Sequence, residues 1–519
     1  MLKKAIVLAL SFVIILIVGF SQSSAQDANP LNSLLYSNQA NMFSDQGIAM
    51  DPVSIIMPGT AYAGGFGSFL DNPASAALHK QSFGQFGLAY TDLKETTEFT
   101  GASRVQDDNQ FNLSNAGFIY SFPTSQGSLV VGAGYNQHTV FKRALGFRGR
   151  NEQTTITDQF KTPGSTYSEI AFNTFATDYG DEFEDWDESI FRIGFDEFGD
   201  YLGVQQQGEI FESGYGGEYS FFAATEFQEN LMIGMSLGVL NGQYKYDRLF
   251  QEVDNFNLYS SDFIDTNDDG TGDTDIDNIL LQDKISSTYT GIKLRAGLIY
   301  KLSDILNIGA SYTLGTRMEI EEKFDANIQT TFDNGVAFDD ELNSEFTYYV
   351  EMPSRTSIGF SLNNLNSISV SAAAEYVNYA GTRIDFNDGS LFEDEIAEND
   401  FIQNNFRSVW NLKGGIQFDV NDGFILRGGY SFLPSKFENG TDDRSVFSLG
   451  TGISVSDNIQ LQLALQYKYW DEVSSVYDYA DYDYTTLPEE APTFTIQSEN
   501  ASRSVDRLQL LSTIRFNLY

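Results

Sequence analysis

Hydrophobic and polar residues alternate along most of the chain from about residue 81 onward. In residues 508–519, LQLLSTIRFNLY, one parity is mostly leucine and isoleucine, whereas the other holds Gln509, Thr513 and Arg515. A period of two residues predicts a β-strand with one apolar and one polar face. Such strands come in pairs joined by short turns rich in Asn, Asp, Ser and Gly, which is typical of antiparallel hairpins.

The pattern predicts fourteen strands. They are expected at 82–94, 111–122, 128–142, 213–228, 230–246, 284–302, 305–324, 345–364, 367–380, 406–420, 423–433, 444–456, 458–470 and 503–518. All six internal tight turns lie at one end of these strands. The seven long connections, 95–110, 143–212, 247–283, 325–344, 381–405, 434–443 and 471–502, lie at the other. Short turns at one rim and long loops at the other are expected of an outer-membrane barrel, whereas a soluble sandwich or propeller spreads its loop lengths more evenly.

The polar parity of the strands carries charges that a dry core would not tolerate. On strand 284–302, Leu294 and Leu298 lie on one face, and Lys293 and Arg295 lie on the other. In lipid every backbone N–H and C=O must be hydrogen-bonded, so strands cross a bilayer only when the sheet closes. We therefore expect an all-β fold, a transmembrane antiparallel β-barrel with a wet lumen, in which the last strand pairs with the first.

Residues 1–25 have the features of an export signal. Two lysines precede an apolar run over residues 5–20, and Ser23-Ser24-Ala25 offers a small-residue cleavage site. The alternative is a membrane anchor, because the run is near the lower length limit for a spanning helix. We expect export with cleavage after Ala25, and the barrel over residues 81–519.

The composition excludes several classes of protein. The chain has 72 Asp and Glu against 30 Lys and Arg, a net charge of −42 that repels nucleic-acid phosphates. Aromatic residues make up 14%, too many for a disordered acidic chain. Without cysteine there is no disulfide, thiolate metal site or cysteine nucleophile. We find no catalytic motif around His79 or His138 and no nucleotide-binding glycine pattern, so we expect no enzyme and no required cofactor.

Two stretches resemble a known family. FLDNPASAAL, residues 69–78, contains Asn72-Pro73-Ala74, and residues 425–467 run from an Arg-Gly-x-Tyr strand through a proline to an Asp-Arg that opens a Ser-x-Gly strand. The second stretch contains Arg427, Gly428, Tyr430, Pro434, Asp443, Arg444, Ser448 and Gly450. On these motifs, over roughly residues 35–519, the chain resembles the FadL family of outer-membrane long-chain fatty-acid transporters.

The resemblance implies a fourteen-stranded barrel plugged by residues 26–80, with hydrophobic ligands diffusing through a lateral gap in the wall. It also implies the outer membrane of a Gram-negative bacterium, with outer-membrane lipid and the barrel-assembly machinery as partners. Asn72-Pro73-Ala74 is then either a rigid turn between plug and wall or a part of the gate, because proline suits such a junction better than a ladder position.

Several lysines and arginines fall on the inward parity. They are Lys293, Arg295, Arg317, Lys413, Arg427, Arg444, Arg507 and Arg515. One interpretation is a lumenal ion-pair network that stiffens the barrel. The other is that one or two of them bind a ligand carboxylate, which a guanidinium fits bidentately. We expect Arg295 or Arg317 to do so, because they lie on neighbouring strands.

Two acidic loops are candidate sites as well. DTNDDGTGD matches the start of a calcium loop, with oxygen ligands from Asp265, Asn267, Asp269, the Thr271 carbonyl and Asp273. The alternative is a solvated acidic loop, since the position that normally supplies a bidentate glutamate is Ile276. Residues 178–200 interleave acids with aromatics and suit either an amphipathic helix at the barrel mouth or a capped surface loop.

The pattern and the resemblance together predict a transporter that passively admits long-chain fatty acids or other hydrophobic small molecules. The alternative is a non-transporting barrel of the same fold, a scaffold that docks partner proteins through its acidic loops.

Overall fold

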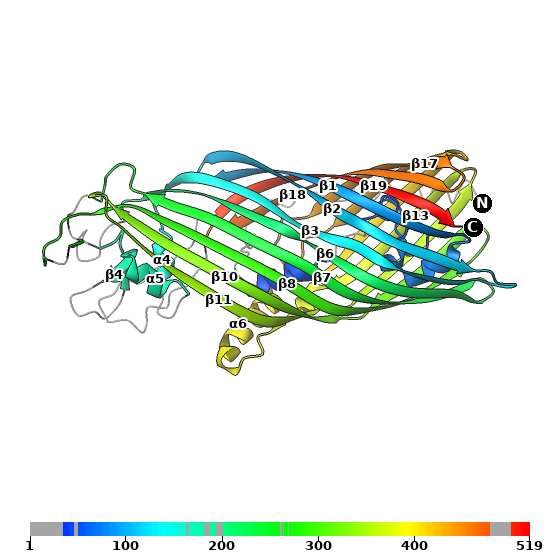
Figure 1. The fold of residues 1–519 in the computed structure, drawn as a ribbon, viewed down its shortest axis with the longest axis horizontal. Helices are drawn as coiled ribbons and strands as arrows, with labels where there is room; N and C mark the ends of the chain where they lie inside the picture. Colours follow the sequence, from blue (N-terminus) through cyan, green and yellow to red (C-terminus); the bar gives the residue numbers. More distant parts are fainter. Residues whose placement is uncertain are drawn as a thin grey trace.

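In the computed structural model the predicted strands close into one barrel (Figure 1). The structure describes residues 35–45, 50–161, 166–180, 187–193, 201–259, 262, 264–267, 269–477 and 500–518. Over these residues the wall contains fourteen antiparallel strands, two of them interrupted. They are β1 (Ser82–Phe99), β2 (Ala102–Phe122), β3 (Leu129–Asn151), β6 (Val204–Gln228), β7 (Leu231–Val253), β8 (Ile276–Lys301), β9–β10 (Leu306–Thr313 and Thr316–Phe332), β11–β12 (Ala337–Met352 and Arg355–Leu365), β13 (Ile368–Asn378), β15 (Ser408–Asn421), β16 (Phe424–Leu433), β17 (Arg444–Ser456), β18 (Ile459–Ser475) and β19 (Asn500–Leu518). The last strand pairs with the first from Ser82↔Leu518 onward, which confirms the predicted closure.

The predicted and observed strands agree at the short-turn end and differ at the long-loop end. The expected loop 95–110 is wrong, because β1 and β2 continue through it and meet at a tight turn. That turn consists of Thr100 and Gly101, both with positive φ. The other strands near it also lengthen; β3 runs on to Asn151. Their outward residues beyond the apolar band are acidic or polar, and this composition resembles that of a loop.

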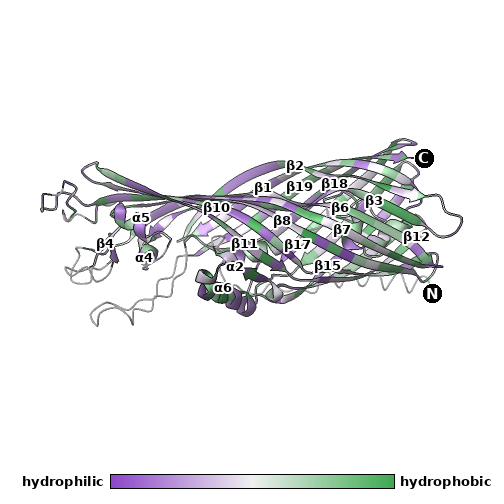
Figure 2. Ribbon diagram, turned by 60° about the horizontal axis from the view of Figure 1, so that its bottom comes forward, coloured by the Kyte–Doolittle hydropathy of each residue, from purple (hydrophilic) through white to green (hydrophobic). Residues whose placement is uncertain are grey.

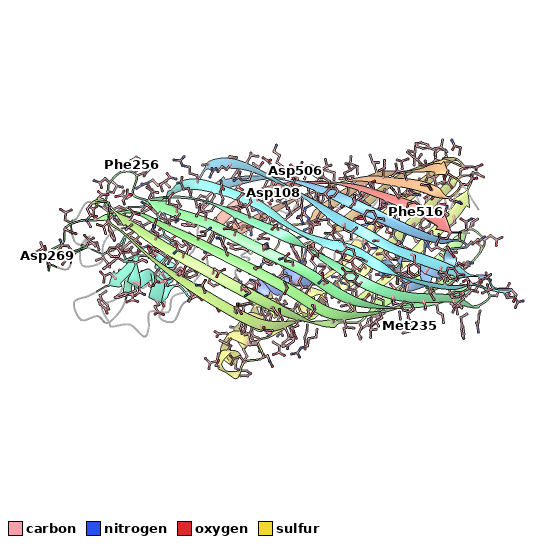
Figure 3. The ribbon with its side chains drawn as sticks, viewed as in Figure 1. Asp108, Met235, Phe256, Asp269, Asp506 and Phe516 are labelled. Atoms are coloured by element: carbon pink, nitrogen blue, oxygen red, sulfur yellow. The ribbon has the colours of Figure 1, made fainter. Side chains whose placement is uncertain are left out.

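The outer face of the barrel changes character along its length. Met235 and Phe516 point outward in the short-turn half and are 66% and 45% exposed, whereas the exposed Asp506 marks the level at which the outer face turns acidic (Figure 3). Apolar residues gather on the strands of the short-turn half, and hydrophilic ones on the strands beyond it (Figure 2). No helix of the described residues is long and apolar enough to cross a membrane. The exposed apolar residues on the strands of the short-turn half form the kind of band that faces lipid in an outer-membrane barrel.

Short elements fill the lumen and its mouth. The lumen holds α2 (Tyr36–Ser44), and farther toward the short-turn end α3 (Ser68–Asp71) and the 3-10 helix η1 (Pro73–Leu78). The connection from β3 to β6 carries α4 (Thr157–Phe160), α5 (Ser168–Asn173), β4 (Thr177–Tyr179) and β5 (Asp187–Ser189), and that from β13 to β15 carries η2 (Tyr379–Gly381), β14 (Arg383–Asp385), η3 (Gly389–Leu391) and α6 (Phe392–Asn405). A large apolar core joins α2, α4 and α5 to the inner faces of the long strands.

Several predicted segments fall wholly or partly on residues that the structure does not describe, among them residues 26–34 and 46–49 of the expected plug 26–80. The expected export signal, residues 1–25, lies outside the described residues. Of the segment 178–200, residues 178–179 and 187–189 pair as parts of β4 and β5, and the other described residues form turns or bends, so the described residues do not form the helix that was one of the two expectations.

Candidate functional site: a gap in the barrel wall

The wall opens between β2 and β3. Their ladder runs from Phe122↔Leu129 only as far as Asn115↔Asn136. Beyond it, β3 stays paired with β6 up to Asn151 and β2 stays paired with β1 up to Ala102. Residues 102–114 of β2 and 137–151 of β3 thus have a ladder partner on one side only, and we call this opening the wall gap.

The wall gap begins within the apolar band. Phe111 and Leu113 of β2 lie beside it and are 65% and 40% exposed on the outer face. One ladder step beyond Phe111, the exposed outer residue on the neighbouring strand β1 is Asp92. Residues 111–114 therefore leave about 14 Å of the wall without a β2–β3 ladder at the level of the apolar band, taking about 3.4 Å per residue.

Side chains replace the missing ladder on the free edge of β3. The Ala144 N–H donates to Glu95 Oε1 at 3.0 Å. Arg507 donates to the carbonyls of Val140 and Lys142 at 3.5 and 3.3 Å. Buried backbone groups need hydrogen-bond partners. On this edge of β3 the partners are the inward side chains of β1 and β19. The free edge of β3 consequently lies inside the barrel, behind β1 and β2.

Polar contacts bound the lower part of the wall gap. At the end of the ladder the Met50 N–H donates to Gln137 O, and Asn115 Nδ2 donates to Met50 O, both at 3.0 Å. Farther along, Lys142 of β3 forms an ion pair with Asp108 of β2 at 2.5 Å and donates to the Asn109 carbonyl. The stretch between these two sets of contacts is therefore a bounded window within the wall gap.

A cavity of about 190 Å³ lies behind the wall gap, lined by residues 138–143 of β3, by α2 and by β17, β18 and β19. Its lining contains seven cations and four acids, in a protein whose net charge is −42. The cations are Lys142, Arg143, Lys436, Arg444, Lys468, Arg503 and Arg507, and the acids are Asp45, Glu212, Asp442 and Glu472. The cavity lining therefore carries a net positive charge, whereas the whole chain is strongly negative.

Most of these cations are paired. Arg143 meets Glu212, Arg503 meets Glu472, and Lys436 and Arg444 share Asp45 at 3.3 and 2.8 Å. Burial would raise the pKa of the Asp45 carboxyl, yet Lys436 and Arg444 hold that pKa well below its usual range. The shared carboxylate therefore stays ionised between its two partners.

Lys468 and Arg507 differ from the other cations. They are direct partners in the β18–β19 ladder, and within the described residues no ion pair reaches either of them. Both lie over the Trp470 ring, 5.2 and 5.4 Å from its centroid. Like charges directly opposite each other destabilise a sheet, and ring contacts offset only part of that cost. This pair is therefore the part of the cavity best suited to receive an anion.

The structure places seven of the eight candidate cations facing the lumen, and Arg507 is one of them because it lines the cavity. Arg295 holds Glu218 with two bonds of 2.6 and 2.7 Å. Lys413 meets Asp71 at 3.4 Å, and Arg444 belongs to the cavity. The remaining three are Lys293, which is buried, Arg427, which donates to Gln417 and Gln462, and Arg515, which stacks on the Phe83 ring. Ion pairing and stacking dominate, and ligand binding by these residues stays a prediction.

Arg317 is a correction, because it points outward. Its side chain is 48% exposed, pairs with Asp385 at 2.7 Å and lies 4.0 Å from the centroid of the Tyr349 ring. The regular alternation of 305–324 placed it inside. The strand is in fact interrupted at Leu314 and Gly315, between β9 and β10, and the interruption reverses the parity that follows. Arg317 does not line the cavity. Lys468, which the sequence did not single out, does line it.

Asn72-Pro73-Ala74 lies at the junction of plug and wall. Asn72 Oδ1 accepts from the Ala74 N–H at 2.9 Å and so caps η1. Its Nδ2 donates to the carbonyls of Thr60, Leu298 and Ala310 at 2.7, 3.1 and 3.3 Å. These bonds join two parts of the plug to β8 and β9. Asn72 therefore anchors the plug to the wall. A role in gating stays a prediction.

A belt of wall glycines surrounds the plug. At nine glycines in the described part of the wall, an added Cβ would overlap or crowd atoms of the plug. They are Gly117, Gly134, Gly234, Gly297, Gly309, Gly359, Gly415, Gly429 and Gly450, and the plug residues they meet are Ile56, Met57, Thr60, Ala61, Phe66 and Asn72 to Ala74. Glycine allows this close approach because it has no side chain. The plug therefore touches the wall on many strands at backbone distance.

The predicted calcium loop is closed by its own hydrogen bonds. The Asp265 carboxylate accepts from the backbone N–H groups of Asn267, Asp269 and Gly270, and Asp269 accepts from Thr271. The Asp273 carboxylate accepts from Thr266. Among the described residues no three acidic or histidine side chains converge as metal ligands. Calcium binding stays a prediction.

Comparisons with known proteins agree with this architecture. The model of a family described as outer membrane protein transport protein (OMPP1/FadL/TodX) matches residues 224–500. The crystal structure of the P. putida toluene transporter TodX is 13% identical, with a TM-score of 0.50 over 91% of this chain and 99% of that chain. A Pseudomonas aeruginosa FadL homologue is 10% identical, with a TM-score of 0.51 over 92% and 100%. A comparison with curated proteins found no match. The structural likeness concerns the fold, and the family model spans more than half of the chain.

Proposed function

Because the chain belongs to the outer membrane protein transport protein family (OMPP1/FadL/TodX), we propose that it lets hydrophobic small molecules cross the outer membrane passively through the wall gap. The observation that carries the proposal is the end of the β2–β3 ladder at Asn115↔Asn136, inside the apolar band and in front of a cavity. An opening at this height lets a ligand leave the lumen for lipid without crossing the plug. The glycine belt supports this route, since it leaves little space around the plug.

The substrate class we propose is a long-chain fatty acid. TodX, one of the structural relatives, is a toluene transporter by its title, and toluene has no anionic group to pair with a cation. In this chain Lys468 and Arg507 face each other across the ladder beside Trp470, without an acidic partner in the described residues. A carboxylate between them would relieve their repulsion and accept charge-assisted hydrogen bonds. The acyl chain would extend through the wall gap past Phe111 and Leu113.

Equilibrium binding in lipid nanodiscs tests this proposal with three ligands of increasing simplicity, namely dodecanoate, dodecanol and toluene. A charge-assisted hydrogen bond contributes about 1.5–3 kcal/mol, so dodecanoate should bind about ten to a hundred times more tightly than dodecanol. Lys468→Ala should remove most of this preference and leave dodecanol binding unchanged.

The outcomes separate the alternatives. Equal affinities for dodecanol and dodecanoate would indicate that the site does not recognise a carboxylate and that the substrate is a neutral hydrophobic molecule. If none of the three ligands binds and none is taken up by proteoliposomes, transport is refuted and the scaffold alternative stands.

A further inference from the structure

The wall gap needs a cause, because β2 and β3 could pair further. Continuing the last observed pairs past the bulges at Ser114 and His138 would bring Asn112 opposite Thr139. Closing the gap would add several ladder hydrogen bonds, each of which is net stabilising. Something in the folded barrel must hold β3 away from β2.

A buried ion pair occupies the position where the ladder is missing. Glu95 of β1 and Arg503 of β19 both face the lumen and are buried. Glu95 Oε2 accepts from Arg503 at 2.6 and 3.1 Å, and Glu95 Oε1 accepts the Ala144 N–H of β3 at 3.0 Å. The carboxylate therefore joins the free edge of β3 to two strands of the wall.

Packing on both sides of this carboxylate favours the same position of β3. Ala144 lies in an apolar cluster with Leu93, Trp470 and Val505, which come from β1, β18 and β19. Farther along, an added Cβ at Gly149 would overlap Thr100 of the β1–β2 turn. The strand thus passes close behind its neighbours, and the Glu95 carboxylate accepts a hydrogen bond from its free backbone edge.

We infer that Glu95, with Arg503, is a positioning residue that holds β3 inside the barrel and so keeps the wall gap open. Glu95 would not touch the ligand; it sets the width of the path. The inference rests on the proposed function for its consequence, passage of a ligand through the wall gap, but the position of β3 can be measured without any ligand. Arg503 keeps a second partner, Glu472 at 2.6 Å, so loss of Glu95 does not leave it unpaired.

Disulfide trapping tests the inference cleanly because the chain has no cysteine of its own. Asn112→Cys with Thr139→Cys places one thiol on each edge of the wall gap, and the disulfide forms only when the edges meet. In the parent background we expect slow oxidation. Glu95→Ala should speed it about tenfold, the effect of losing a charge-assisted hydrogen bond on the closing equilibrium. Glu95→Gln should give a smaller increase, since its amide oxygen still accepts from Ala144.

The matched control is Glu98→Ala, which removes an outward acid from the same strand and should leave the rate at the parent level. Heat-modified mobility on gels shows which variants contain a folded barrel. If Glu95→Ala folds and oxidises no faster than the control, the inference is overturned. If Glu95→Ala does not fold, Glu95→Gln decides: a rate above the control supports the inference and an equal rate overturns it.

The disulfide-locked barrel then separates this inference from the proposed function. Loss of dodecanoate uptake on oxidation, with recovery on reduction, supports passage through the wall gap. Uptake that continues in the locked barrel would refute that path, while the dependence of the oxidation rate on Glu95 would still stand.

Discussion

The short-turn half of the barrel and the half above the wall gap differ in what touches the wall. Below Asn115 the ladder is unbroken, and the plug rests against glycines such as Gly415 and Gly309 at backbone distance. Above it the ladder is open, and side chains such as Glu95 and Arg507 reach the backbone of β3. In the short-turn half, glycines let the plug pack directly against the wall. In the other half, side chains bind the free edge of β3 and replace the missing ladder.

This difference assigns separate tasks to the two halves. Contacts between backbone and backbone leave no room for a ligand and change only if the plug moves as a unit. Contacts between a side chain and a free strand edge can exchange for a ligand or water, one bond at a time. A path that begins above the plug and ends at the wall gap uses only the second kind of contact. The comparison predicts that substitutions in the lower half alter stability and leakage, whereas those in the upper half alter ligand passage.

The largest effect is expected from Arg295→Ala, in the closed part of the wall. Glu218 reaches Arg295 across β7 because Gly238 has no side chain in its way. Removing the arginine takes the bidentate ion-pair partner from a buried carboxylate, which costs about 3–5 kcal/mol of unfolding free energy. Urea unfolding in detergent, followed by tryptophan fluorescence, measures the change. Arg295→Ala with Glu218→Gln should recover part of the loss, and a change under 1 kcal/mol would contradict the role of this pair.

A smaller effect is expected from Gly415→Leu, which tests the seal directly. Its side chain would overlap the Ile56 carbonyl of the plug, and such overpacking costs about 1–3 kcal/mol. The neighbouring Gly414 has open space around its Cβ position, so Gly414→Leu is a matched control. Single-channel recording in planar bilayers should show ion conductance for Gly415→Leu and none for the control. Equal conductance in both variants would show that the glycine belt does not seal the plug.

The sequence predicted the architecture because the lipid-facing strands must alternate. Fourteen strands, the closure of β19 onto β1 and the positions of the short turns followed from a period of two and from turn residues. The long-loop ends were predicted too short, since outward residues beyond the apolar band, such as Glu98, need not be apolar. Polarity there carries no signal that distinguishes strand from loop.

The site was less predictable, because it depends on departures from the alternation. A two-residue interruption at Leu314 and Gly315 reverses the side on which Arg317 lies, and no composition marks it. The wall gap is a missing ladder between strands that are each regular, so periodicity along β3 does not reveal it. Lys468 becomes notable only when the register places it opposite Arg507. A like-charge pair across two strands could have been found by aligning the predicted hairpin 444–470 with the last strand.

Asp108→Ala tests the upper limit of the bounded window within the wall gap and should have a modest effect. Its carboxylate is partly exposed and pairs with the buried Lys142 at 2.5 Å. A partly solvated pair contributes about 0.2–1 kcal/mol, so dodecanoate uptake by proteoliposomes should rise by no more than about fivefold. Asp107→Ala, the outward neighbour, is the control. Slower uptake in Asp108→Ala would mean that the ion pair helps to form the path and does not limit it.

The smallest effect is expected from Arg317→Ala, and it decides the register of the interrupted strand. If the regular alternation continued through Leu314 and Gly315, Arg317 would face the lumen and its loss would weaken dodecanoate binding about tenfold or more. In the structure it lies outside, over the Tyr349 ring and against Asp385. An exposed pair of this kind contributes about 0.2–1 kcal/mol to stability and is not part of the ligand path. Dodecanoate affinity in nanodiscs should therefore stay within about twofold of the parent, while Lys468→Ala, assayed beside it, loses its preference for the acid. A tenfold loss in Arg317→Ala would place the arginine in the lumen and refute the interruption between β9 and β10.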